Sequence, residues 1–175
     1  MATTYKAIAT VTVGSGGATS IGFSNIPQTY TDLVILVSSR TDGSGNMCMQ
    51  INGSTTSYSQ IRLGGTGSGT YSNTSTGQSG SPGNSFLAGI SGGSSNTAST
   101  FGSAQIYIPN YTSNNNKSAA SESNQENNAT TAYSELFAGL WSNTSAVTSI
   151  TLLTYDTGGK FVQYSTATLY GIKNS

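Results

Sequence analysis

Side chains that could do chemistry are scarce in this sequence of 175 residues, which has no histidine and one cysteine. The lack of histidine removes the most common general base, the usual hydrolytic triad and most zinc sites. A single cysteine cannot form an intrachain disulfide or a thiolate metal cluster. Cys48 lies between Met47 and Met49 in an expected strand, so we expect a buried and inert thiol.

The six carboxylates show no pattern that is typical of an active site, although a glycosidase needs two of them facing one cleft. Four lie in turns or in a polar stretch of the chain: Asp42, Asp156, Glu122 and Glu126. Asp32 begins a strand, where a carboxylate often accepts bonds from nearby backbone N–H groups. We expect structural roles for all six and a protein that is not an enzyme, with a pairing of Asp32 and Glu135 left open as the alternative.

Two glycine-rich segments, 14–17 and 64–67, lack the following helix and the lysine of a phosphate-binding loop, and are interpreted as turns. The segment 42–46 offers oxygen ligands for calcium but has no closing carboxylate, so calcium there is only a minor alternative. The sequence predicts no cofactor and no metal.

Tyrosine gives the one binding signal. There are ten tyrosines, and five of them lie in or beside expected loops rich in Asn, Ser and Gly, a mixture suited to contacts with protein or sugar. The competing interpretation is that most of them fill the core of a β-sandwich. The five candidates for an interaction surface are Tyr58, Tyr71, Tyr107, Tyr111 and Tyr133.

Hydrophobic residues alternate with polar ones in short segments separated by turn residues, which predicts an all-β protein. We expect one domain over 1–175: a single β-sandwich, jelly-roll-like, with eight to eleven short antiparallel strands and long loops rich in Gly, Ser, Thr and Asn. At 5–13 we expect the odd-numbered residues to share one face. The expected strands cover 5–13, 19–26, 32–39, 47–52, 58–63, 85–90, 101–108, 117–120, 133–141, 147–155 and 167–172.

Residues 64–84 form the longest segment without strand character and are rich in Gly, Ser and Thr. We expect a long flexible loop or contact arm there, because loops of about 20 residues are uncommon in a compact domain unless they are functional or disordered. Residues 121–128 form the most polar stretch and are also expected to lie outside the strands.

Charge is nearly absent from this chain. Charged residues make up 7% and the net charge is zero, against about 25% charged residues in a typical soluble domain. Nucleic acid and anionic membranes normally require a basic patch, so neither is an expected partner. No signal peptide and no membrane span are expected.

Three segments resemble structural proteins of tailed phages, including phages of aquatic bacteria. They are Phe23-Ser24-Asn25-Ile26-Pro27-Gln28-Thr29-Tyr30-Thr31-Asp32-Leu33, then Ile51-Asn52-Gly53-Ser54-Thr55-Thr56-Ser57-Tyr58-Ser59 with Leu63-Gly64-Gly65, and the ending Phe161 with Ser165-Thr166-Ala167-Thr168-Leu169-Tyr170-Gly171-Ile172. The resemblance covers about a third of the chain. It implies an oligomeric β-sandwich subunit on a capsid or tail, and it carries no catalytic residue.

The first functional hypothesis is a capsid decoration (cement) protein on the virion surface. We expect it to be made in the host cytoplasm, to assemble as a trimer, to bind the major capsid protein shell or other virion subunits, and to stabilise the shell. The alternative is a tail-fibre or receptor-binding tip module that recognises host surface polysaccharide through loop tyrosines or an exposed Trp141. A cellular carbohydrate-binding domain and a glycan-cleaving enzyme are weaker possibilities.

Overall fold

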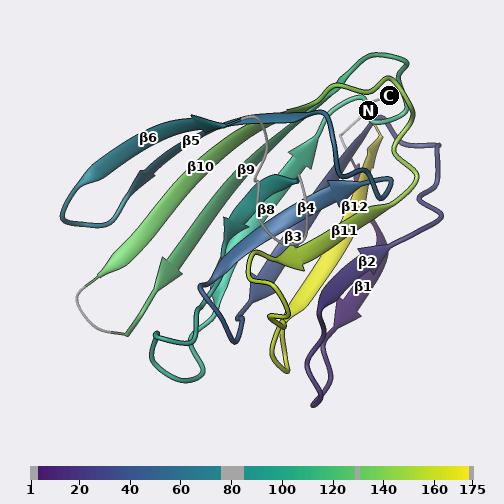
Figure 1. Ribbon diagram of the computed structural model, residues 1–175. Coiled ribbons are helices and arrows are strands. Elements are labelled where there is room, and N and C mark those ends of the chain that lie inside the picture. The colour runs from purple at the N-terminus through teal and green to yellow at the C-terminus, as the bar shows by residue number, and fades with distance from the viewer. Residues whose placement is uncertain (1–3, 76–84, 129–130, 174–175) are drawn as a thin grey trace.

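Two antiparallel sheets pack face to face in the computed structural model (Figure 1), which describes residues 4–75, 85–128 and 131–173. The larger sheet has eight strands, in the spatial order β1 (Thr4–Thr12), β12 (Thr166–Lys173), β3 (Asp32–Ser39), β8 (Gly102–Ile108), β9 (Lys117–Glu126), β10 (Ala132–Trp141), β5 (Tyr58–Gly65) and β6 (Thr70–Ser75). The smaller sheet has four, in the order β2 (Ser20–Phe23), β11 (Ile150–Thr154), β4 (Asn46–Ile51) and β7 (Phe86–Ile90). The expected all-β sandwich is confirmed.

The strand pairs are nested along the chain. β1 pairs with β12, β2 with β11, β3 with β8, β4 with β7, and β5 with β6. Successive pairs alternate between the larger and the smaller sheet. β9 and β10 form an additional antiparallel pair inserted between β8 and β5. The chain therefore folds like one long hairpin that wraps around the core.

The core lies between the sheets because alternate residues of each strand point inward. In β3, for example, Leu33, Ile35 and Val37 are buried. From the smaller sheet, Met49 and Leu152 join the same hydrophobic cluster. The described residues include no helix that could cross a membrane.

The expected long loop at 64–84 is wrong in its first part. β5 continues to Gly65, and β6 occupies Thr70–Ser75, which raises the strand count to twelve, above the expected eight to eleven. β6 is an edge strand whose residues are exposed apart from the partly buried Tyr71, so it lacks the apolar alternation that marks a strand. Residues 76–84 lie outside the described residues.

The polar stretch at 121–128 also differs from expectation, since β9 runs through most of it. Ser121 and Ser123 take inward positions because they bond the backbone of β7. Ser121 Oγ donates to the Ala88 carbonyl at 2.5 Å, and Ser123 Oγ accepts from the Ile90 N–H at 3.1 Å. These contacts satisfy backbone groups at the edge of the smaller sheet, which would otherwise be buried without partners.

A register shift between Ala7 and Ala9 changes the expected alternation in β1. Ile8 is the extra residue, so the faces exchange beyond it. Ile8 and Val11 pack against the core, whereas Tyr5 is 57% exposed. The expectation that residues 5 and 11 share a face is therefore wrong.

Candidate functional site

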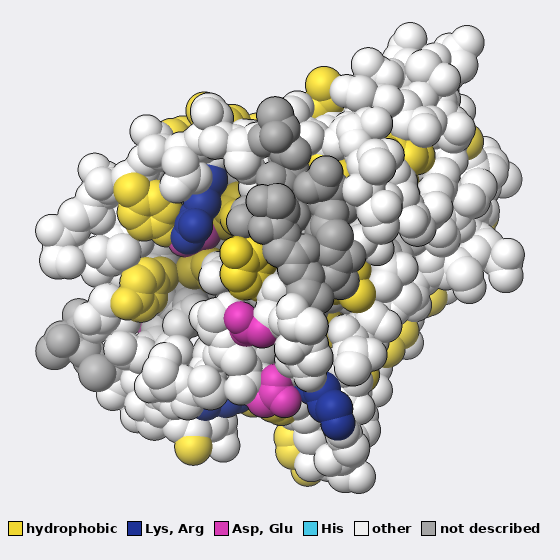
Figure 2. All heavy atoms as spheres, in the orientation of Figure 1, with side chains coloured by type: hydrophobic (Ala, Val, Ile, Leu, Met, Phe, Trp, Pro, Cys, Tyr) yellow, Lys and Arg dark blue, Asp and Glu magenta, His cyan; other side chains and the backbone are white. Residues whose placement is uncertain are grey.

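A cleft of about 530 Å³ lies where the end of the larger sheet meets the loops that flank the smaller one. Two tyrosines and several amide side chains line it, and Ile90 of β7 contributes apolar surface. Figure 2 shows the hollow, where a basic side chain meets an acidic one between hydrophobic side chains. The side chains used below are Arg62, Tyr71, Asn73, Gln125, Tyr133 and Glu135.

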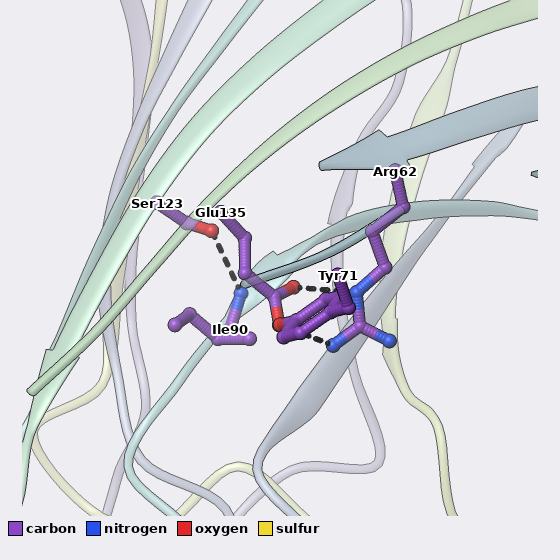
Figure 3. A network of polar contacts seen from close by, with 5 residues as sticks. All are labelled: Arg62, Tyr71, Ile90, Ser123 and Glu135. Atoms are coloured by element: carbon purple, nitrogen blue, oxygen red, sulfur yellow. Dashed lines mark hydrogen bonds and ion pairs between the residues drawn. The ribbon is translucent and has the colours of Figure 1, made fainter. Parts of the chain in front are cut away.

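An ion pair lies in the wall of this cleft. The inward positions of β5 and β10 bring Arg62 and Glu135 together, and Arg62 Nε donates to Glu135 Oε2 at 3.0 Å. Arg62 Nη2 contacts the other carboxylate oxygen, which makes the pair bidentate. The Tyr71 hydroxyl donates to that same oxygen, so three donors converge on one carboxylate (Figure 3). Glu135 is 2% exposed, and these contacts compensate for the burial of its charge.

Gly64 allows Tyr71 to take its place. The two residues are paired across β5 and β6, and a Cβ on Gly64 would lie 2.5 Å from the Tyr71 ring. The ring therefore lies across the glycine. The Arg62 guanidinium is 4.8 Å from the ring centroid, within cation–π range. The glycine, the guanidinium and the carboxylate together fix the orientation of this ring.

The protonation states in this network follow from its geometry. Burial and the neighbouring carboxylate of Glu135 raise the pKa of Tyr71, so its hydroxyl remains a donor at neutral pH. Burial opposes the charge on Arg62, but the contacts with Glu135 and Tyr71 outweigh it and raise the pKa of Arg62. Arg62 therefore remains cationic, and its positive charge is matched by one carboxylate.

The structure separates the five predicted tyrosines into three groups. Tyr71 and Tyr133 line the same cleft. Tyr107 is 37% exposed on the outer face of the larger sheet, and its hydroxyl donates to Asp32 Oδ2 at 2.9 Å. Tyr58 and Tyr111 are buried in the core, so they cannot contribute to an interaction surface in this fold.

Aromatic packing explains why Tyr58 is buried. Its ring lies 4.8 Å from that of Phe86 and stacks on that of Trp141, and its hydroxyl accepts from the Ile51 N–H at 2.9 Å. Trp141 is 2% exposed, so it is not available for the exposed binding role that the alternative hypothesis gave it. Tyr111 is held by a hydrogen bond from its hydroxyl to the Pro27 carbonyl.

The open alternative of a paired Asp32 and Glu135 is not supported by the topology. Glu135 lies opposite Ser123, which lies opposite Ala104, which in turn lies opposite Val37 on β3. Asp32 is five residues from Val37 along that strand. The two carboxylates are therefore three strands apart across the sheet, and each has its own hydrogen-bond partners.

The turn carboxylates bond to backbone amides. Asp42 Oδ1 accepts from the Lys160 N–H at 2.6 Å, and Asp156 Oδ2 accepts from the Ser44 N–H at 2.5 Å. Within residues 4–75, 85–128 and 131–173, no group of three His, Cys, Asp or Glu side chains is placed to hold a metal ion.

A second candidate surface is the outer face of the larger sheet over β5 and β10. An antiparallel sheet normally presents polar side chains to water on its outer face. Here the outward positions carry exposed large hydrophobic residues on two neighbouring strands. These are Ile61 at 43%, Leu63 at 47%, Leu136 at 52% and Leu140 at 37% exposure. We call these four residues the outer apolar patch.

Register makes the outer apolar patch continuous. Leu136 lies directly opposite Leu63, and Ala138 lies opposite Ile61. A shallow groove of about 570 Å³ borders Ile61 and Leu140 beside β6. The outward positions of β8, which is separated from β10 by β9, are Ser103, Gln105 and Tyr107. Tyr5, Leu36 and Tyr107 are also exposed on other strands of this sheet, but the outer apolar patch is where four exposed aliphatic side chains lie on two paired strands.

Sequence reasoning did not identify the Arg62–Glu135 pair or the outer apolar patch. The alternation Tyr58, Gln60, Arg62 places Arg62 on the buried face, which is a signal that it needs a buried partner.

Comparison of the chain with protein families, with curated proteins and with solved structures found no match in any of the three.

Proposed function

We propose that this protein is a structural subunit on the surface of a tailed-phage particle, and that it acts as a capsid decoration protein. The observation that carries the proposal is the outer apolar patch, because exposed hydrophobic clusters on soluble proteins mark surfaces of association. Three segments of the sequence support a phage origin through their resemblance to virion proteins. The proposed occupant of the patch is the shell of the major capsid protein.

The nested strand pairing supports the jelly-roll part of the proposal. In a jelly roll, a long antiparallel hairpin wraps into two sheets, and this architecture recurs in viral capsid proteins and in lectins. Here five nested pairs alternate between the sheets, with β9 and β10 as an insertion.

The distribution of charge also supports assembly on a protein shell. Four pairs of residues on β9 and β10 lie opposite one another at outward positions, and Glu122 is the sole charged residue among them. The pairs are Ser118 with Leu140, Ala120 with Ala138, Glu122 with Leu136, and Asn124 with Ser134. Glu122 lies directly opposite Leu136 of the patch, so a partner that covers the patch has to pair this one carboxylate or leave it in contact with water at the rim. The other outward positions in this part of β9 and β10 carry no charge, which limits the electrostatic cost of association. A trimer remains our proposal for the oligomeric state, and sedimentation equilibrium of the purified protein measures it.

Binding to capsids from which this protein has been stripped tests the proposal. Saturable co-sedimentation of the purified protein with such capsids is expected, together with greater resistance of the capsids to heat. Absence of binding over a concentration range that reaches tens of micromolar would reject the decoration role.

The second candidate function is a receptor-binding tip module that recognises host surface polysaccharide. The cleft between Tyr71 and Tyr133 favours it, because the cleft combines aromatic rings with amide side chains. A pull-down with host cells separates the two candidates. Cell binding that free polysaccharide abolishes, without capsid binding, would favour the receptor-binding role.

A further inference from the structure

The cleft has no uncompensated charge in its described lining. Arg62 and Glu135 are the charged side chains that line it, and they neutralise each other in a bidentate pair. The Tyr71 hydroxyl donates a further hydrogen bond to the Glu135 carboxylate. A ligand with a phosphate, sulfate or carboxylate would have to compete with Glu135 for Arg62. The cleft is therefore matched to a ligand without net charge.

Several polar groups of the cleft are free to bind a ligand. Asn73, Gln125 and Tyr133 line it, and their side chains make no hydrogen bond within residues 4–75, 85–128 and 131–173. An amide side chain both donates and accepts, as does a phenol. A sugar hydroxyl also donates and accepts, so each of these side chains can form a hydrogen bond with it as donor or as acceptor.

The aromatic rings provide the other half of the recognition. A pyranose ring has hydroxyls at its rim and C–H groups on its faces, and tyrosine offers a rigid apolar surface beside a polar hydroxyl. Tyr71 is fixed over Gly64 by its contacts with Arg62 and Glu135. A ring that is already ordered loses little conformational entropy when a ligand packs on it.

From these observations we propose that the cleft is a binding site for a neutral saccharide, with Tyr133, Gln125 and Asn73 as its ligand-bonding residues. Its volume of about 530 Å³ lies within the range of small-ligand sites. The inference specifies the ligand of the second candidate function, and it is independent of assembly through the outer apolar patch. A structural virion subunit could carry such a site on its free side.

An array of oligosaccharides tests this proposal. The array should hold neutral hexose and N-acetylhexosamine chains beside matched chains that bear uronic acid, sialic acid or sulfate. The wild-type protein is expected to bind neutral chains and to bind the acidic ones more weakly. Tyr133→Ala and Gln125→Ala are each expected to lower affinity by about tenfold or more. Tyr133→Phe keeps the ring and separates the contribution of the hydroxyl.

The matched control is Tyr164→Ala, which removes an exposed tyrosine outside the cleft lining and should leave binding unchanged. Thermal unfolding of each variant shows that a loss of binding is not a loss of fold. Failure of the folded protein to bind any saccharide, a preference for acidic chains, or equal binding by the cleft variants would overturn the proposal. The proposal would also be overturned if the protein bound a peptide on a peptide array and the same cleft variants abolished that binding. Capsid binding is measured separately, so either proposal can fail without the other.

Discussion

Arg62 on β5 and Glu135 on β10 form a bidentate ion pair on the inner face of the larger sheet, where Arg62 keeps 23% and Glu135 2% of its side-chain surface exposed. The pair joins two neighbouring strands in the wall of the cleft, beside Ile90 of β7. It also orients Tyr71 through the shared carboxylate. One contact thus contributes both to the stability of β5 and β10 and to the shape of the cleft.

Removing the carboxylate should weaken the fold measurably. We expect Glu135→Gln to lower the free energy of unfolding by about 1–3 kcal/mol, since it leaves the Arg62 charge without its partner but Arg62 can still reach water. Urea unfolding followed by tyrosine and tryptophan fluorescence measures the change. Glu122→Gln on the exposed outer face is the control and should stay within about 0.5 kcal/mol of wild type. Equal unfolding midpoints for Glu135→Gln and wild type would show that the pair contributes nothing.

Gly139 should tolerate no side chain. A Cβ at this position in β10 would overlap the ring of Phe86, which itself packs against Tyr58. We expect Gly139→Ala to destabilise the protein by about 1–3 kcal/mol through overpacking.

Gly22→Ala provides the matched comparison, because nothing lies within 4 Å of its added Cβ. Its stability should equal or slightly exceed that of wild type. A Gly139→Ala variant that unfolds at the same urea concentration as Gly22→Ala would contradict the packing described for β7 and β10.

Cys48 should be unreactive in the native protein. Burial raises the pKa of its thiol from the ordinary 9.0 to about 11, and the thiolate is the reactive form. We expect alkylation by iodoacetamide at pH 8 to be at least about a hundredfold slower in native protein than in urea-unfolded protein. Mass spectrometry of samples taken over time measures both rates.

The same shift has a consequence for stability. Because the folded pKa lies above the unfolded one, this thiol stabilises the native state fully below pH 9, and that contribution falls as the pH rises toward 11. Cys48→Ala should remove this part of the alkaline dependence. Rapid native alkylation at pH 8 would show that Cys48 is accessible.

Period-two alternation predicted strands such as β10, expected at 133–141 and found at Ala132–Trp141. The same alternation did not predict strand positions where an inward-facing side chain is polar because it hydrogen-bonds the other sheet. Ser121 and Ser123 of β9 bond the edge of β7, and a sequence pattern shows hydrophobicity rather than a partner on another sheet. β6 was missed because it is an exposed edge strand in which Tyr71 is the only partly buried residue, so it shows no apolar alternation.

The cleft was only partly predictable for a related reason. The criterion was a tyrosine in or beside an expected loop rich in Asn, Ser and Gly. It selected Tyr71 and Tyr133, but it also selected Tyr58 and Tyr111, which are buried. Arg62 and Glu135 are 73 residues apart in the chain. Their contact depends on the register between β5 and β10, which the sequence pattern of either strand alone does not determine.

The central claim, assembly through the outer apolar patch, is tested most directly by one co-sedimentation experiment with stripped capsids. It compares wild type with the double variant Leu63→Lys/Leu136→Lys, which places two charges at the paired centre of the patch. Ser103→Lys/Gln105→Lys, on the polar outer face of β8, is the control for added charge. The account predicts saturable binding by wild type and control, and at least a tenfold loss of affinity for the folded patch variant. Equal binding by the patch variant, or no capsid binding by wild type, would contradict it.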